Sequence, residues 1–291
     1  MEFFSEISAV QNIIYIISSI LFITGIKMLG KEDTAVKGNF LSAFAMFIAV
    51  AITVVSVIDP IILLIGIALG AIIGSSIALK VKMTSIPEMV ALFNGFGGLA
   101  TFLIAWSEFN SIPDSLFQHI LIVITVFIGG VTFTGSLIAY GKLSEKIKIA
   151  KTSIITKIFT TVFYTSLIFL IYSIVQPVMP ILDFDFFTVL LVLTLLAGIG
   201  FVLPIGGGDM PVVISLLNSL SGIAAALAGL LLLNNVLIVA GSLVGASGLI
   251  LTIIMAKAMN RSITNILFVG YASSSTSTSS EEQGEVSPIS V

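Results

Sequence analysis

The sequence lacks cysteine, has a single histidine and carries very little charge. Without cysteine the chain has no disulfide and no thiolate metal ligand, and His119 alone cannot build a histidine metal cluster. Charged residues make up 9% of the 291 residues, whereas a soluble domain carries about 25%. A soluble protein of this composition would have too little polar surface to face water.

The N-terminus lacks the common targeting signals. It begins with an acidic stretch containing Glu2 and Glu6, without the basic region and the small-residue cleavage site of a secretory signal. The arginine-rich, acid-poor pattern of a transit peptide is absent as well. These absences favour a bacterial origin, and we expect a multi-pass protein of the bacterial plasma (inner) membrane.

Long apolar runs dominate what is present. Hydrophobic residues make up 57% of the chain, and the mean hydropathy is +1.21. A spanning helix needs about 20 apolar residues, and these runs are too long and too apolar for membrane strands. We therefore predict an all-α fold, a polytopic bundle of nine transmembrane helices near 8–29, 39–57, 60–79, 86–107, 116–140, 153–176, 185–203, 210–232 and 235–258.

The charges indicate how these helices are threaded. With nine helices, all twelve basic residues fall on one side of the membrane: Lys27, Lys31, Lys37, Lys80, Lys82, Lys142, Lys146, Lys148, Lys151, Lys157, Lys257 and Arg261. The other side carries only acidic residues, namely Glu2, Glu6, Asp59, Glu108, Asp114, Asp183 and Asp185. The positive-inside rule then predicts an N-terminus outside and a cytoplasmic C-terminus. A wrong helix count would have mixed the two sets.

One stretch, 205–222 (IGGGDMPVVISLLNSLSG), combines a turn with a polar helix. Its three glycines let the backbone turn, Asp209 is a good N-cap, and Pro211 suits a first helical turn. Asn218 follows about two turns into an otherwise apolar helix, where its amide needs a hydrogen-bond partner in protein or water. The asparagine either joins two helices or forms a polar gate within the membrane.

Pairs of small residues predict close helix packing. Gly70 and Gly74, and likewise Gly241 and Gly245, have the GxxxG spacing. The run 95–100 (GFGGLA) also fits the dinucleotide-binding fingerprint, but that motif requires a preceding strand. Because the run lies inside a predicted spanning helix, we interpret its glycines as residues that admit a neighbouring helix or thin the wall of a cavity, and not as a nucleotide site.

The other polar residues of the spans gather in the fourth, fifth, eighth and ninth helices. They are Asn94, Thr132, Thr134, Ser136, Asn218, Ser219, Ser221, Ser242 and Ser247. None of the spans has an acid or a base near its centre. Amides and hydroxyls can hold water and relay a proton but cannot keep one at neutral pH. If the protein moves protons, we expect another chain to supply the titrating group.

The composition changes after Gly270. The run 273–280 (SSSTSTSS) is typical of a flexible linker, and Glu281, Glu282 and Glu285 continue it. We therefore divide the chain into a transmembrane domain, 1–270, and a disordered cytoplasmic linker, 271–291. The linker predicts a tether to a soluble domain that this sequence does not contain.

Five runs of residues together resemble one protein family. The chain is similar to the beta subunit of the proton-translocating NAD(P)+ transhydrogenase over essentially 1–270. The runs are 86–95 (IPEMVALFNG), 131–143 (VTFTGSLIAYGKL), 207–219 (GGDMPVVISLLNS), 243–248 (LVGASG) and 257–262 (KAMNRS). The family's beta subunit has nine membrane helices with the N-terminus outside, as predicted above.

The resemblance implies an activity and partners. The family's enzyme transfers hydride from NADH to NADP+ while protons cross the membrane inward. NAD(H) is bound by the alpha subunit, and NADP(H) by a domain that follows the membrane part of the beta subunit. The resemblance thus implies that this chain alone binds no nucleotide and no metal, and catalyses no hydride transfer. It implies as partners the alpha subunit or subunits, the NADP(H)-binding domain, the lipid bilayer and a second protomer, with no nucleic acid.

The resemblance also implies roles for single residues. Asn218 corresponds to the family's channel asparagine, and Ser247 and Gly248 to small residues of the ninth span. Asp209 and Arg261 correspond to charged residues that couple the channel to the NADP(H) domain, and Lys257 lies beside them. Many members have a proton-carrying histidine where this sequence has Asn94. We therefore expect Asn94 and Asn218 to line a hydrated path to which a partner chain supplies the protonating group.

Two other classes of function stay open. A stand-alone secondary transporter would show related halves with broken helices and a central charge, and we find neither. A structural subunit for membrane assembly would use the same polar groups only for helix packing.

Overall fold

The computed structural model describes residues 2–56, 60–110, 115–147, 154–175 and 184–272. Within these ranges the chain forms helices and no strand, which confirms the predicted all-α fold. The helices are α1 (Glu2–Leu29), α2 (Ala35–Ser56), α3 (Ile61–Lys80), η1 (Met83–Ser85), α4 (Ile86–Asn110), α5 (Leu116–Leu143), α6 (Ile154–Val175), α7 (Phe184–Val202), η2 (Gly207–Asp209), α8 (Met210–Leu231), α9 (Asn235–Ala258) and α10 (Ile263–Ala272). The linker predicted at 271–291 lies almost wholly outside the described residues.

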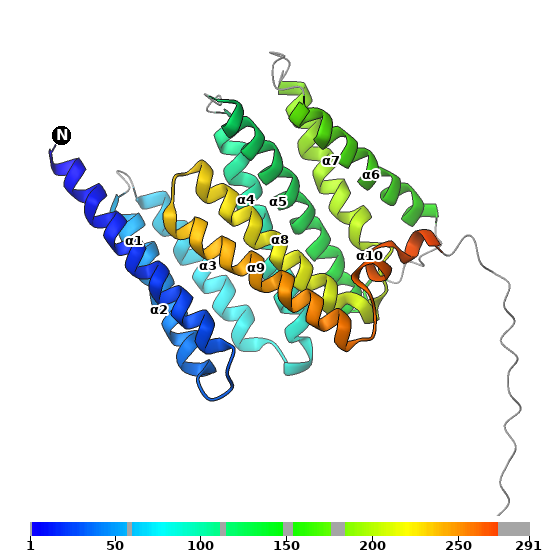
Figure 1. Cartoon of the computed structure of the whole chain (residues 1–291), viewed down its shortest axis with the longest axis horizontal. Helices are drawn as coiled ribbons and strands as arrows, with labels where there is room; N and C mark the ends of the chain where they lie inside the picture. Colours follow the sequence, from blue (N-terminus) through cyan, green and yellow to red (C-terminus); the bar gives the residue numbers. More distant parts are fainter. Residues whose placement is uncertain (1, 57–59, 111–114, 148–153, 176–183, 273–291) are drawn as a thin grey trace, which may run out of the picture.

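The long helices agree with the predicted spans. Eight of the described helices, α1 to α6, α8 and α9, are long and apolar enough to cross a membrane. The apolar part of α7, Phe187–Val202, is shorter, so the count of nine stays a prediction. The α1–α2 and α3–α4 connections and the end of α9 lie at one side of the molecule, opposite the N-terminus and the α8–α9 loop (Figure 1). Lys31, Lys82 and Lys257 belong to that side, as the threading by charge requires.

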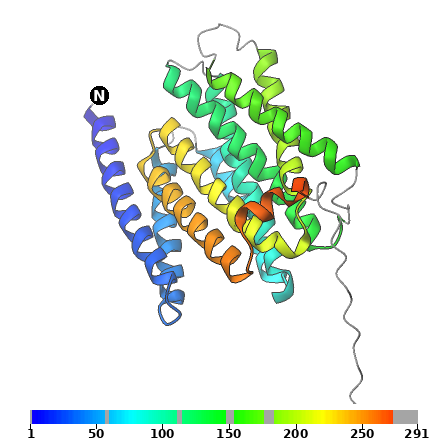
Figure 2. The same ribbon diagram turned by 45° about the vertical axis from the view of Figure 1, so that its right-hand side comes forward.

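Helix α5 is the centre of the bundle. Fifteen of its residues are buried, and it packs against α4, α7 and α8. The α1–α2 hairpin lies at one flank and the α6–α7 pair at the other (Figures 1 and 2). Large apolar side chains remain exposed on α1, α2, α3 and α9, such as Ile20, Phe47, Ile62 and Ile254. A polytopic protein presents such side chains to lipid, because lipid tails are as apolar as the side chains.

Helices α4 and α5 approach closely where both have glycine. A Cβ atom built on Gly98 would lie 2.9 Å from the carbonyl oxygen of Gly129, and one on Gly129 would lie 2.9 Å from that of Gly98. The glycines of the run 95–100 therefore lie inside α4 and serve helix packing, as predicted, and the dinucleotide motif has no strand before it.

The two predicted GxxxG pairs behave differently. On α9, Gly241 and Gly245 face Gly222 of α8, which confirms that this pair packs helices closely. On α3, no heavy atom lies within 4 Å of the Cβ position of Gly70 or Gly74, and no residue of the helix is buried. The prediction of close packing is therefore wrong for α3 within the described chain, because this helix lies apart from the bundle.

Helix α10 was absent from the predicted spans. It is ten residues long, and the N–H of Asn265 donates a hydrogen bond of 3.1 Å to the Ser262 hydroxyl at its start. Its residues Ile266 and Leu267 pack into the apolar cluster that also contains Val202, Ile205 and Met210. The segment before the linker is thus packed against the α7–α8 connection.

We expect Gly222→Ala to loosen the α8–α9 contact. The added Cβ would lie 2.9 Å from the Gly241 carbonyl oxygen and the Gly245 Cα, and backbone atoms cannot move aside as a flexible side chain can. The free energy of unfolding should fall by about 1–3 kcal/mol, measured by denaturant titration in detergent. The matched control is Gly70→Ala on α3, and equal stability of the two variants would contradict the close packing.

Candidate functional site

The polar residues form two groups, one midway along the helices and one at the end where α7 joins α8. The first group contains Asn94, Ser136 and Asn218 and the hydroxyl residues between α8 and α9. The second contains Asp209, Arg261 and Lys142. Each group is described in turn.

Asn94 contacts the buried centre of α5. Its Nδ2 donates a hydrogen bond of 2.9 Å to Ser136 Oγ, and Ser136 is fully buried. Gly95 permits this contact, since a Cβ there would lie 3.2 Å from the Cβ of Ser136. One turn along α5, the hydroxyl of Thr132 is fully buried and has no hydrogen-bond partner among the described residues. Asn94, Ser136 and Thr132 thus form a polar row between two helices.

Asn218 lies at the level of Asn94 but on an open face. Both α4 and α8 run opposite to α5, and a Cβ on Gly97 would lie 3.4 Å from Ser221 Oγ. Helices α4 and α8 therefore run in the same direction, and they touch at Gly97 and Ser221. Asn94 precedes Gly97, and Asn218 precedes Ser221, by three residues, so the two asparagines lie at about the same level, one helical turn before the contact. The Asn218 side chain is exposed and makes no hydrogen bond with a described residue. It is free to bind water or another chain.

Hydroxyl groups bind the backbone across the α8–α9 contact. From α8, Ser219 Oγ donates to the Gly245 carbonyl at 2.6 Å and Ser215 Oγ donates to that of Gly248 at 3.3 Å. Within α9, Thr252 Oγ1 donates to the same Gly248 oxygen at 2.7 Å. A Cβ on Gly248 would lie 2.9 Å from Ser219, so only glycine fits there. The hydroxyls therefore hold α8 and α9 together.

Ser247 and Gly248 do not share a face of α9. Gly248 is buried against α8, whereas Ser247 is exposed and donates only to the Val244 carbonyl of its own helix, at 3.2 Å. Ser247 is therefore exposed on α9, outside its contact with α8.

The charged end of the site contains one ion pair. Arg261 Nη1 donates to Asp209 Oδ2 at 3.1 Å, and the two side chains are 47% and 10% exposed. Asp209 occupies the N-cap position of α8, but its carboxylate makes no capping hydrogen bond, so the predicted capping role is wrong. The ion pair takes the carboxylate instead. Pro211 lies in the first turn of α8, as predicted.

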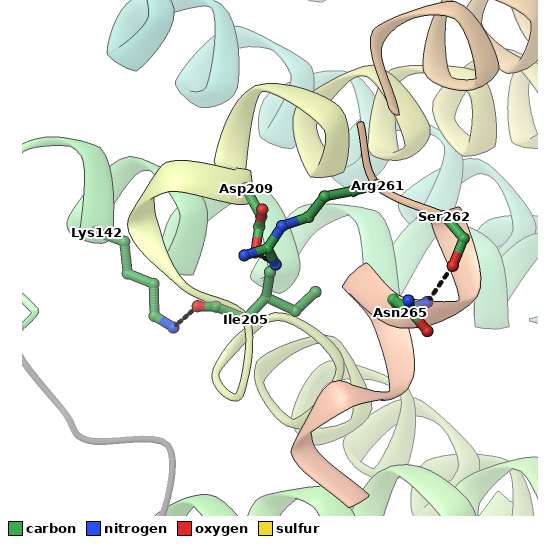
Figure 3. A network of polar contacts seen from close by, with 6 residues as sticks. All are labelled: Lys142, Ile205, Asp209, Arg261, Ser262 and Asn265. Atoms are coloured by element: carbon green, nitrogen blue, oxygen red, sulfur yellow. Dashed lines mark hydrogen bonds and ion pairs between the residues drawn. The ribbon is translucent and has the colours of Figure 1, made fainter. Parts of the chain in front are cut away.

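Lys142 is a second cation at this end, and in the sequence it stands out only as one of the twelve basic residues on one side of the membrane. Its Nζ donates to the backbone carbonyls of Val202, Leu203 and Ile205, with 3.3 Å to Val202. In Figure 3 Lys142 reaches Ile205 from one side, while Arg261 reaches Asp209 from the other. A lysine at the end of a helix is a common pattern, so no specific signal in the sequence predicts this contact.

Lys257 is not part of the ion pair. It is exposed on the last turn of α9 and lines an open hollow of about 520 Å³ with Asn260, Arg261, Ser262 and Thr264. The structure thus brings together two of the three residues expected at the coupling end, Asp209 and Arg261. Among the described residues, no group of three histidine, aspartate or glutamate side chains could hold a metal ion.

Comparison with known proteins gives a consistent result. The family model of the NAD(P) transhydrogenase beta subunit matches residues 11–291. Two sequences from Rhodospirillum rubrum, one of them from a defined strain, are named NAD(P) transhydrogenase subunit beta. Each is 36% identical to this chain over 273 residues, which is 89% of this chain and 58% of the relative. The chain therefore spans less than two thirds of the length of these relatives.

The ion pair should respond asymmetrically to substitution. Arg261→Gln leaves the mostly buried Asp209 carboxylate without its cation, so the free energy of unfolding should fall by about 1–3 kcal/mol. Asp209→Asn should cost less, because the half-exposed Arg261 keeps its hydration. Denaturant unfolding of both single variants and the double variant in detergent measures this difference. Equal costs for the two single variants, or strict additivity in the double variant, would contradict the pair.

Proposed function

The chain belongs to the NAD(P) transhydrogenase beta-subunit family, and on this basis we propose that it conducts protons for a membrane-bound transhydrogenase. In this proposal, inward proton movement drives hydride transfer from NADH to NADP+. The nucleotides bind to other parts of the complex, NAD(H) to the alpha subunit and NADP(H) to a domain beyond the linker.

One observation supports the proton path above the others. The Asn94–Ser136 hydrogen bond lies at the level of Asn218, in helices whose spans have no central acid or base. Amides and hydroxyls orient water and pass a proton along it, but they do not titrate near neutral pH. The path therefore needs a protonating side chain from elsewhere.

The open face of α4, α8 and α9 suits a partner helix. Asn218 on α8 and Ser247 on α9 are both exposed, and an unpaired amide such as that of Asn218 costs free energy when it faces lipid. Helix α3 is exposed along its whole length. We propose that helices of the alpha subunit cover these surfaces and bring a titratable side chain, such as histidine, next to Asn94 and Asn218.

Coupling to the nucleotides would act at the charged end. With the N-terminus outside, the Asp209–Arg261 pair lies on the cytoplasmic side, close to the linker that leads to the NADP(H) domain. NADP+ and NADPH would bias which side of the membrane the path opens to, by making different contacts in the two states. The complete enzyme would be a dimer of protomers in a bacterial plasma membrane.

A structural role without a proton path is the second candidate. The hydroxyls of Ser215, Ser219 and Thr252 all bind backbone carbonyls across or along α8 and α9. These contacts need no proton movement. The two candidates differ in the role of Asn218, which makes no such contact.

We expect Asn218→Leu to abolish coupled proton movement, because leucine cannot bind water on the path. The assay co-expresses this chain, the alpha subunit and the NADP(H)-binding domain, and follows hydride transfer from NADH to NADP+ together with pH change in sealed vesicles. The rate of coupled proton movement should fall at least about a hundredfold, as expected when a positioned proton relay is lost. The matched control is Asn39→Leu, an exposed asparagine on α2. Full coupling in the Asn218 variant would support the structural role instead.

Asn94→His tests where the titrating group lies. If a partner side chain protonates the path beside Asn94, a histidine at this position is accommodated and coupled activity stays within about tenfold of wild type. Its pH profile should acquire a further ionisation near neutral pH, because histidine titrates there. An inert variant, with no partner histidine accessible to this path, would refute the hydrated path at Asn94.

A further inference from the structure

The segment between α7 and α8 is held by two cations from different parts of the bundle. Lys142 at the end of α5 binds three carbonyl oxygens at its start, and Arg261 after α9 binds Asp209 at its end. The two contacts differ in kind. Arg261 pairs with a charged side chain, whereas these three contacts of Lys142 are with backbone carbonyls.

The Lys142 contact matches the chemistry of a helix end. An ammonium group has three N–H donors, and here they meet the carbonyls of Val202, Leu203 and Ile205. The last carbonyls of a helix lack partners within it and carry partial negative charge, which a cation stabilises. All three residues are nearly or fully buried, although Lys142 itself is partly exposed. Lys142 therefore fixes the position of residues 202–205.

The following residues are held less tightly. No heavy atom lies within 4 Å of the Cβ positions of Gly207 and Gly208, so packing does not confine them. Asp209 is then bound to the half-exposed Arg261. Ile205 and Met210 also pack with Ile266 of α10, the helix next to the linker. A movement that starts at α10 or Arg261 would reach 202–205 through these contacts.

Helix α5 connects Lys142 to the polar row. Ser136, which accepts the hydrogen bond from Asn94, precedes Lys142 by six residues, about 9 Å along the helix. Directly before Ser136, Gly135 packs against Val202, with 3.1 Å from its Cβ position to Val202 Cγ2. Helix α5 thus contacts the end of α7 twice, through Gly135 and through Lys142.

We infer that Lys142 is the positioning residue that transmits movement of the 202–209 segment to α5 and the Asn94–Ser136 bond. When the carbonyls of residues 202–205 stay on the ammonium group, α5 and the segment move as one unit. When the contact is lost, the nucleotide state no longer controls the path. This inference rests on the proposed function and adds a route for its coupling.

The first test separates coupling from hydride transfer. Lys142→Met keeps the chain length and removes the charge, so protons moved per hydride should fall about fivefold or more. Hydride transfer itself should stay within about twofold of wild type, since this chain supplies no nucleotide site in the proposal. Lys142→Arg keeps the charge, so its ratio of protons to hydride should lie between that of Lys142→Met and that of the wild type. The measurement uses the assembled complex with alpha subunit and NADP(H)-binding domain in sealed vesicles.

Lys146→Met is the matched control. Lys146 lies four residues further on, and its Nζ donates to the Tyr140 hydroxyl at 3.2 Å on the exposed side. The same change of charge there should leave the proton-to-hydride ratio unchanged. A purely electrostatic effect of removing one lysine would lower the ratio in both variants, and this result would overturn the inference.

A second readout observes the segment directly. Because the chain has no cysteine, Gly207→Cys introduces a single thiol at an open position. Its rate of maleimide labelling should differ between NADP+ and NADPH in the assembled complex, and Lys142→Met or Lys142→Arg should change that difference. If Lys142→Met fails to assemble, the labelling rates with NADP+ and NADPH are compared between wild type and Lys142→Arg.

The outcomes separate the inference from the proposed function. A wild-type complex that transfers hydride without moving protons would refute the proposed function. Proton movement in the wild type with an unchanged ratio in Lys142→Met refutes only the role of Lys142. A labelling rate at residue 207 that is the same with NADP+ and NADPH also refutes only the role of Lys142.

Discussion

The absence of water from a bilayer is the constraint on which the rest of this structure depends. Backbone groups are satisfied within helices, because nothing in the hydrocarbon can pair with them. Many hydroxyls are satisfied in the same way by their own helix: Thr125 donates to Leu121, Thr160 to Thr156 and Ser173 to Phe169. Since lipid tails compete with apolar side chains, helix association depends on close backbone contact at glycines. The α4–α5 and α8–α9 contacts have this character.

The same constraint means that polar side chains without a partner in their own helix must find one in another helix, in water or in another chain. Asn94 and Ser136 pair between two helices, and the Thr132 hydroxyl is buried beside them without a described partner. Asn218 lies at the same level on a face that this chain leaves open. Uncharged polar groups of this kind can orient water but do not titrate near neutral pH, which is why the proposed function assigns the titrating step to a partner chain.

Glycines let the helices pack closely within the bundle. At the end that the proposed threading places on the cytoplasmic side, charged side chains make the contacts between elements instead. The α7–α8 segment is packed at Val202, Ile205 and Met210 but not around Gly207 and Gly208, and two cations add contacts on either side of these glycines. Lys142 binds backbone carbonyls in a buried setting, and Arg261 binds Asp209 at the edge of solvent. A segment held by a few polar contacts can adopt a second arrangement at lower cost than a close-packed helix pair can.

The sequence by itself determined the membrane class, the all-α fold, the approximate spans and the family, because hydropathy and charge act over local stretches and the family runs are specific. Only the tertiary structure decided which small residues pack, since Gly222 and Gly98 meet other helices whereas Gly70 meets none. It also paired Asp209 with Arg261 in place of a helix cap, turned Ser247 away from Gly248, and brought Lys142 to residues sixty positions away. These outcomes depend on how the helices rotate and approach one another. That arrangement follows from all contacts at once, and no single periodicity in the chain encodes it.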